Sequence, residues 1–454
     1  MSSEQRDGKQ QPTLILHLDV NKTLIFTDKA SGHSLEGLVN STIASRTFGT
    51  INDTVQPPIW TPVLLSSATS TCSPLVDINA LYSYDAYVRE ILLPYKDIHQ
   101  KSDGTTLTSD EQNLIVEENK QIRKQRIQLT TVFTEINQPG EQFREEYLQL
   151  LSALQLSSED ISLCKSKPEL NLLVELQTRF LFPSYFQLLL WLLETKRKFL
   201  IIFRTFGQDL IDVITEHNIF VQGNHPLYPI SIADNSLLPG LLSLIVPLPY
   251  NTGMFIRQGT LHTTDSKLIT IIGTNYHDNN SNTTKLTNIA HTTVNSKEYI
   301  QPHVNMIMGY HDIYNYFLSL LPNNNNKNPL DPGTVVGIRD DYVAWFSNGQ
   351  KGHVGKLMPF DIENKNIHSI FFDDNCGDDK DAFVTMNPRL SNYGSSSCTD
   401  PRILDPRIIT NSKSLTWPEV RNIYAVTVDP YSAVLDKDYF IKAIEMCEKN
   451  RSNI

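Results

Sequence analysis

The sequence is poor in cysteine, with five residues scattered through 454 and no Cys-x-x-Cys pair. An odd number of isolated cysteines favours neither a disulfide framework nor a structural zinc site. The sequence also lacks a basic excess, because 39 lysines and arginines stand against 50 aspartates and glutamates, for a formal net charge of −11. Proteins that bind duplex nucleic acid usually present a basic face to the phosphates, so we expect no nucleic-acid partner.

Long apolar runs are absent as well. The longest strongly apolar run covers residues 188–193, whereas a helix that crosses a bilayer needs about 20 apolar residues. The first residues are polar and contain no apolar signal core. We therefore expect a cytoplasmic protein with no membrane partner, while the oligomeric state stays open.

Several motifs that mark common enzymes are missing too. The chain has no G-x-x-x-x-G-K-S/T, no G-x-G-x-x-G, no H-E-x-x-H and no G-x-S-x-G. A P-loop ATPase, a Rossmann dehydrogenase, a zincin and a serine hydrolase therefore have no local support. Any chemistry must be sought in single polar residues placed by the fold.

Three short apolar runs are present, at 13–18, 199–203 and 367–372. Continuous runs of this length predict parallel strands that are buried on both faces. The second run directly follows a segment, 184–198, whose apolar residues recur at helical spacing. This helix-to-strand order predicts a doubly wound α/β fold, in which ligands bind beyond the carboxyl ends of the strands.

Polar residues follow each predicted strand, namely Asp19, Thr205 and the pair Asp373–Asp374. Each has an ordinary explanation as a turn former or a solvated acidic loop. Together they would converge at one edge of the sheet, where ionised carboxylates repel each other and need a cation. For oxygen ligands at neutral pH that cation is most naturally Mg²⁺.

The order of these segments resembles the four motifs of the haloacid dehalogenase-like (HAD-like) superfamily. The motif Asp19-x-Asn21-x-Thr23, the strand ending at Thr205, a downstream lysine and the pair after the third strand carry the resemblance. It implies a Rossmannoid core with large, cap-like insertions. It also implies a Mg²⁺-dependent phosphohydrolase or phosphotransferase that acts on a small phosphorylated substrate through an aspartyl-phosphate.

Carried over to this chain, the resemblance implies that Asp19 is the nucleophile. Asp19 and Asp373 would hold Mg²⁺ together with the backbone carbonyl of Asn21, and Asp374 would support the metal or its waters.

Thr205 would bind the phosphoryl oxygens. The preferred phosphate-binding lysine would be Lys356 in "GHVGKLMPF", where a glycine precedes it, with Lys351 as its rival. The alternative interpretation of either residue is an ordinary surface lysine with no role in a site.

Asn21 departs from the family pattern, because phosphate-ester hydrolases of the family have a second aspartate there. An amide has no titratable proton and cannot act as a general acid or base. The chain is then expected to be a slow phosphatase for good leaving groups such as acyl phosphates, or to use another acid, such as His17, Asp28 or a residue from an insertion. Alternatively it binds a phospholigand or a partner without turnover, or Asn21 only closes an Asx-turn.

The sequence divides into a discontinuous core and added segments. The expected parts are a disordered leader (1–11), the HAD-like core (12–27, 171–212 and 331–400), a largely helical first insertion (28–170), a second insertion with Asn-rich loops (213–330) and a C-terminal extension packed on the core (401–454). The insertions are expected to cap the site and select the substrate.

Outside the core strands, local patterns predict further elements. Helices are predicted near 82–93 and over 109–129, the latter capped by Ser109, and strands at 242–246 and 267–272. Residues 334–349 predict a β-hairpin that turns near Asp340–Asp341.

Overall fold

The computed structural model describes most of the chain. The described residues are 11–26, 34–63, 81–97, 105, 107–231, 234–247, 252–258, 267–273, 304–308, 310–322, 333–347, 355–362, 364–376, 386–390 and 421–453. Residues 1–10 of the expected leader, Asp28, Lys351 and the predicted Asn-rich tracts lie outside them.

The chain forms two compact units, which are described separately. One contains residues 1–26 and 156–454, and the other contains residues 27–155. None of the helices in the described part of the chain combines the length and apolar character needed to cross a bilayer.

An eight-stranded sheet forms the centre of the first unit, in the order β13-β11-β1-β5-β9-β6-β7-β8. The first six strands are parallel to one another, whereas β7 pairs antiparallel with both β6 and β8 at one edge. The strands are β1 (Thr13–Asp19), β5 (Phe199–Thr205), β6 (Thr252–Gln258), β7 (Lys267–Gly273), β8 (Val304–Met308), β9 (Gly333–Arg339), β11 (Ile367–Asp373) and β13 (Ala425–Thr427). The predicted α/β fold and its three predicted core strands, β1, β5 and β11, are confirmed.

The helices of the first unit are α5 (Ser158–Cys164), α6 (Asn171–Leu176), α7 (Pro183–Glu194), α8 (Leu210–Val221), α9 (Leu238–Leu242), α11 (Tyr310–Ser319), α12 (Tyr342–Ser347), α14 (Pro430–Leu435) and α15 (Tyr439–Arg451), with two short 3₁₀ turns at Pro168–Leu170 and Asp234–Leu237. The helix predicted before β5 is α7, which begins at Pro183 because a missing N–H is tolerated in the first turn. It ends at Glu194 rather than at residue 198, since Lys196 takes a left-handed φ of 52° that stops the helix.

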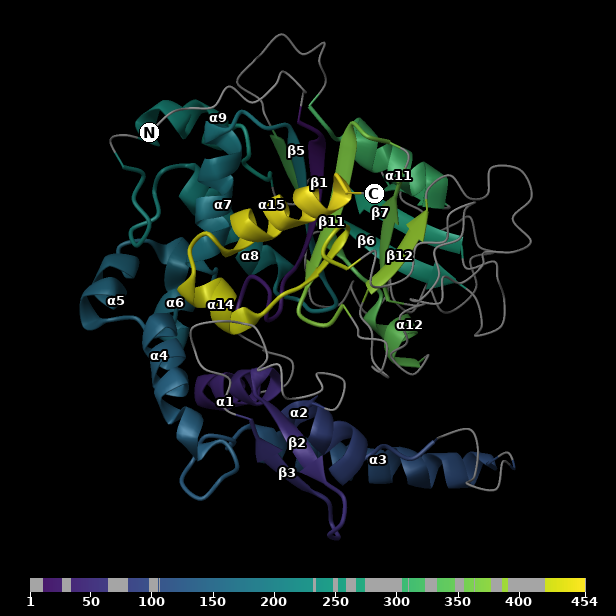
Figure 1. Ribbon diagram of the computed structural model, residues 1–454. Coiled ribbons are helices and arrows are strands. Elements are labelled where there is room, and N and C mark those ends of the chain that lie inside the picture. Colours follow the sequence, from purple (N-terminus) through teal and green to yellow (C-terminus); the bar gives the residue numbers. More distant parts are fainter. Residues whose placement is uncertain are drawn as a thin grey trace. The chain divides into compact units, whose positions relative to one another are not determined.

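Helices cover one face of the sheet through aromatic contacts. Phe203 of β5 lies 5.6 Å from Tyr185 of α7 and 5.9 Å from His217 of α8, measured between ring centroids. Phe372 of β11 packs against Phe440 of α15 at 5.4 Å. Figure 1 shows α7, α8 and the yellow α15 gathered beside these strands.

The other face is covered by α11 and by a separate strand, β10 (Lys356–Phe360), which pairs in parallel with β12 (Met386–Leu390). Ile15, Leu200 and Ile338 of the sheet form a buried cluster with Phe317 of α11 and Leu357 of β10. Apolar residues on both faces explain why β1 and β5 are continuous apolar runs rather than alternating ones.

The strand order reverses at β1. From β1 the chain goes to β5 and β9 on one side and returns to β11 and β13 on the other. In register, Leu18 of β1 lies beside Phe203 of β5 and Phe372 of β11, so the three strands end at nearly the same level. A crevice at such a reversal is the usual ligand site of an open α/β sheet.

The predicted hairpin over 334–349 is wrong. Its first half is β9, a parallel strand of the main sheet, and its second half is α12. The carboxylate of Asp341 accepts the backbone N–H of Ala344 at 2.9 Å, so it caps a helical turn where the sequence suggested a β-turn.

Two smaller predictions also differ from the structure. Residues 242–246 do not form a strand, because α9 ends at Leu242 and is followed by a turn and then by residues without regular secondary structure. The helix predicted at 109–129 is α3 (Ser109–Thr130), but its N-cap is Thr108, which forms a capping box with Glu111.

The segments added to the predicted core contribute to the same sheet. Residues 213–330 supply β6, β7 and β8, and the strand predicted at 267–272 is β7. Within 401–454, β13 pairs with β11, and α15 packs against α7.

The second unit has its own small sheet, in the antiparallel order β3-β2-β4. Its elements are α1 (Leu35–Arg46), β2 (Phe48–Asn52), β3 (Ile59–Pro62), β4 (Tyr82–Ser83), α2 (Tyr84–Tyr87), a π-helical turn (Val88–Leu92), α3, a 3₁₀ turn (Glu141–Phe143) and α4 (Arg144–Leu154). Trp60, Tyr84 and Phe133 form a buried aromatic cluster in it.

Candidate functional site

A tight turn follows β1 and sets the first part of the site. The carbonyl of Val20 accepts the N–H groups of Leu24 and Ile25 at 2.9 and 3.1 Å, so the chain folds back at once. Lys22 takes a left-handed φ of 57° to make this turn. The hydroxyl of Thr23 donates a hydrogen bond to the carboxylate of Asp19 at 3.3 Å and so holds the Asp19 side chain at the end of the strand.

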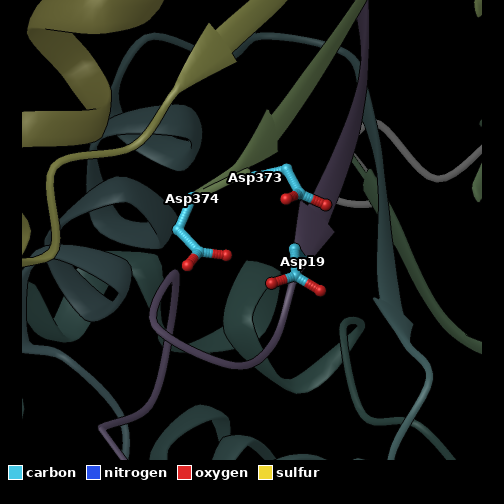
Figure 2. Close-up of side chains that lie close together, drawn as sticks. All are labelled: Asp19, Asp373 and Asp374. Atoms are coloured by element: carbon cyan, nitrogen blue, oxygen red, sulfur yellow. The ribbon is translucent and has the colours of Figure 1, made fainter. Parts of the chain in front are cut away.

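Three carboxylates meet beside this turn. Asp19 ends β1, Asp373 ends β11, and Asp374 follows it. One oxygen from each lies within 4.8 Å of the others, and Figure 2 shows the three groups turned toward a common space. The parallel pairing of β1 with β11 brings together residues that are far apart in the sequence.

Lys356 lies against two of these carboxylates. Its Nζ donates to Asp373 at 2.9 Å and also to Asp19. The lysine is 3% exposed and is the first residue of β10, so a strand, rather than the expected loop, presents it. Of the two lysines predicted from the sequence, the structure places Lys356 at the carboxylates, while Lys351 is outside the described residues.

Burial and charge act in opposite directions on these groups. Burial raises the pKa of Asp19 above its usual range and Lys356 opposes the rise, whereas the neighbouring carboxylates add to it. Burial opposes the charge of Lys356, but Asp19 and Asp373 raise its pKa nonetheless. For Asp374, burial and the charge of Asp373 raise the pKa to about 6.

The donor set fits a hard divalent cation. One ammonium against three carboxylates leaves an excess of negative charge, and carboxylate oxygens are the ligands that Mg²⁺ prefers. The side-chain Oδ1 of Asn21 is buried and makes no hydrogen bond within the described part of the chain. A buried oxygen in that state, two residues after Asp19, suits a metal-bound water or a ligand donor.

Thr205 lies at the end of β5, next to β1. Its Oγ1 accepts the N–H of Gly207 at 2.8 Å, which leaves the hydroxyl hydrogen available for another acceptor. Gly207 allows a close approach here, because a Cβ on it would lie 2.8 Å from Asp209 Oδ2, 3.3 Å from Thr205 Oγ1 and 3.5 Å from Asn21 Nδ2. Asp209, which is 5% exposed, is a carboxylate near the site that sequence reasoning missed.

A buried ion pair behind the carboxylates was also missed. Arg204 donates from Nε to Asp340 at 2.9 Å and from Nη1 to the carbonyl of Leu357 at 2.7 Å, next to Lys356. The arginine that directly follows the apolar run of β5 was the available signal, but its partner lies 136 residues away.

His17 lies in the core of the sheet, two residues before Asp19 on β1. Its ring is buried in the sheet, stacks on Phe371 at 5.4 Å and receives a hydrogen bond from Arg204 at Nδ1. Burial, with Arg204 nearby, lowers its pKa well below the usual value, so the ring is neutral at pH 7. The structure gives His17 a core role, and Asp28 is outside the described residues.

Comparisons of this chain with protein-family models, with curated proteins and with solved structures found no match.

Proposed function

We propose that this protein is a Mg²⁺-dependent phosphohydrolase or phosphotransferase that acts through an aspartyl-phosphate on Asp19, as the resemblance to the HAD-like superfamily implies. The observation that carries the proposal is the meeting of Asp19, Asp373, Asp374 and Lys356 at the carboxyl ends of β1 and β11. This is also where the strand order reverses, which is the usual place for a ligand in such a sheet.

Asp19 is the nucleophile in this proposal, and its carboxylate oxygen attacks phosphorus. Asp19, Asp373 and the Asn21 backbone carbonyl would hold Mg²⁺, with Asp374 in support, and the bound ion would neutralise phosphoryl oxygens during transfer. Lys356 supplies a second positive charge in a buried site, where electrostatic stabilisation is stronger than in water. Thr205 donates its hydroxyl hydrogen to a phosphoryl oxygen.

The test is phosphate release from small phosphate and acyl-phosphate substrates, with Mg²⁺ and with EDTA, in wild type and Asp19→Asn. We expect Mg²⁺-dependent release that the substitution abolishes, because an amide cannot form the acyl-phosphate bond. Circular dichroism of the variant shows whether it is folded. Equal activity of a folded Asp19→Asn protein would overturn the assignment of the nucleophile.

A second candidate function is phospholigand binding without turnover. Asn21 favours it, since the residue that would protonate a leaving group is an amide. In that case phosphate binds with Mg²⁺, Asp19→Asn changes the affinity, and no substrate of the panel is hydrolysed.

A further inference from the structure

An aromatic cluster adjoins the phosphate side of the site. We define it as Phe206, Tyr342, Trp345 and Phe346. Phe206 directly follows Thr205, and its ring stacks on Trp345 with centroids 4.8 Å apart and planes at 15°. The Nζ of Lys356 lies 5.0 Å from the centroid of the Phe206 ring. The aromatic cluster therefore begins next to the ammonium group that is proposed to bind phosphate.

The cluster continues from the site to the surface of its unit. The rings of Tyr342 and Phe346 stack at 5.6 Å and 26° along α12, and Tyr342 lies 6.1 Å from Phe206. Tyr342 is 42% exposed and Phe346 is 50% exposed. Isolated exposed apolar residues are common. Here two stacked ring pairs, joined by an edge-on contact between Phe206 and Tyr342, lead from a buried cation to exposed rings, and such a surface can accept a flat ring.

Asn21 limits the leaving group independently of this surface. An alkoxide leaves poorly unless it is protonated, and the amide of Asn21 cannot supply the proton. A phenol has a pKa of about 10, so its phenolate leaves without that help. An aromatic leaving group would therefore need no general acid, and its ring could pack on the exposed aromatic side chains.

We propose that the substrates are aryl phosphate monoesters, that is, phosphorylated phenols whose ring packs on the aromatic cluster. This inference rests on the proposed function and names its substrate class. A carboxylate oxygen of Asp19 bonds to phosphorus while the phosphorus–oxygen bond to the ring breaks, and the phenolate leaves with the electron pair and takes a proton from water. A water oxygen then bonds to phosphorus, the bond to Asp19 breaks, and phosphate, the carboxylate and a proton are released.

Four substrates separate the two requirements. Phosphotyrosine has both a ring and a good leaving group, whereas a nucleoside 5′-monophosphate has a flat base on an alkyl ester. Acetyl phosphate has a good leaving group without a ring, and glycerol phosphate has neither. We expect kcat/KM for phosphotyrosine to exceed that for both alkyl esters by about 10²-fold or more, the usual contribution of a general acid. We also expect KM for phosphotyrosine to be lower than KM for acetyl phosphate, because only phosphotyrosine has a ring.

Two outcomes of this panel overturn the inference. Alkyl esters that react as fast as phosphotyrosine would mean that another acid, such as Asp209, protonates the leaving group. A KM for phosphotyrosine that is no lower than the KM for acetyl phosphate would mean that the rings contribute nothing. Asn21→Asp supplies a second readout: it should accelerate the alkyl esters far more than phosphotyrosine, and equal effects on both would contradict the role given to Asn21.

Substitutions on α12 test the ring surface directly. Tyr342→Ala and Phe346→Ala should raise KM for phosphotyrosine by about three- to tenfold, as expected for losing one aromatic contact, and raise it less for acetyl phosphate. Val343→Ala is the matched control, since Val343 is 44% exposed on the same helix but lies outside the cluster. Unchanged KM for phosphotyrosine in both aromatic variants would overturn the inference.

The failure of this inference can be told from the failure of the proposed function. If wild type releases phosphate from acetyl phosphate, and Asp19→Asn does not, the nucleophile stands and only the aryl preference is at stake. If wild type with Mg²⁺ releases nothing from any of the four substrates, both proposals are overturned.

Discussion

Lys356 holds two carboxylates whose charges would otherwise repel each other. Its Nζ bonds to Asp19 and to Asp373, and all three side chains are at most 5% exposed. A buried charge whose partner is removed is strongly unfavourable, while an ion pair of the same kind at the surface contributes little. The lysine is thus a structural as well as a proposed catalytic residue.

Removing this ammonium should make the protein depend on a metal for stability. In Lys356→Met we expect a loss of about 3 kcal/mol in the free energy of unfolding without metal, because the carboxylates lose their counter-charge. Mg²⁺ should recover part of it, since the cation can take the place of the lysine between the carboxylates. Thermal and urea unfolding with Mg²⁺ and with EDTA measure both effects.

The matched control is Lys442→Met, which breaks an exposed ion pair with Asp436. It should change stability little and show no response to Mg²⁺. If Mg²⁺ stabilises Lys356→Met no more than it stabilises this control, the carboxylates are not a cation site.

A buried ion pair and a buried hydrogen bond, both made by Arg204, connect the ends of β5, β9 and β10. Arg204 of β5 pairs with Asp340 just after β9 and donates to the Leu357 carbonyl of β10. Arg204 is fully buried and Asp340 is 5% exposed. This ion pair fixes the strand from which Lys356 reaches the site.

Asp340→Asn should therefore destabilise the protein by about 3–5 kcal/mol, because it leaves the charge of Arg204 buried without a counter-charge. Urea unfolding measures the loss, and Asp436→Asn, at an exposed pair of the same unit, is the control. A change in Asp340→Asn as small as in the control would contradict a role for this ion pair in holding the three strands.

The core strands could be predicted from the sequence, but one turn could not. The apolar runs of β1, β5 and β11 mark buried parallel strands by themselves, and the residues that follow them proved to be neighbours. The hairpin over 334–349 was wrong because a helix cap at Asp341 and a β-turn use similar residues. No local signal distinguishes the two when the partner strand is distant.

Other parts of the site could not be found from local pattern. The ion pair of Arg204 with Asp340 depends on how distant strands are paired, and Asp209 and Asn21 lie near Gly207 because that glycine leaves room for them. These contacts arise from packing across the sheet. The ends of the predicted strands placed the carboxylates at one edge of the sheet, whereas only the order of motifs supplied by the resemblance pointed to Lys356.

At the scale of the whole molecule, buried neutral histidines link stability to pH. Burial lowers the pKa of His217 to about 4 and that of His368 to about 3, from a usual value near 6.5. Between these values the unfolded chain binds protons that the folded chain does not, so the free energy of unfolding rises with pH and falls on acidification.

We expect each histidine to lower stability by about 2 kcal/mol between pH 7 and pH 5. Urea unfolding across this range gives the slope, and His217→Gln should reduce it, because glutamine does not titrate. Because its pKa is raised, Asp374 makes the opposite contribution below pH 6, where its protonation stabilises the folded protein. This contribution is equal in wild type and His217→Gln, so it cancels in the comparison. An equal slope in wild type and His217→Gln would contradict the assignment.

The measurement that tests the central claim most directly is a search for the covalent intermediate. The protein is incubated with acetyl phosphate and Mg²⁺, quenched in acid, digested and analysed by mass spectrometry. We predict one added phosphoryl group on the peptide that contains Asp19, absent with EDTA and absent in Asp19→Asn. Hydrolysis of acetyl phosphate with no phosphoryl group on Asp19, or with the group on another residue, would contradict the account.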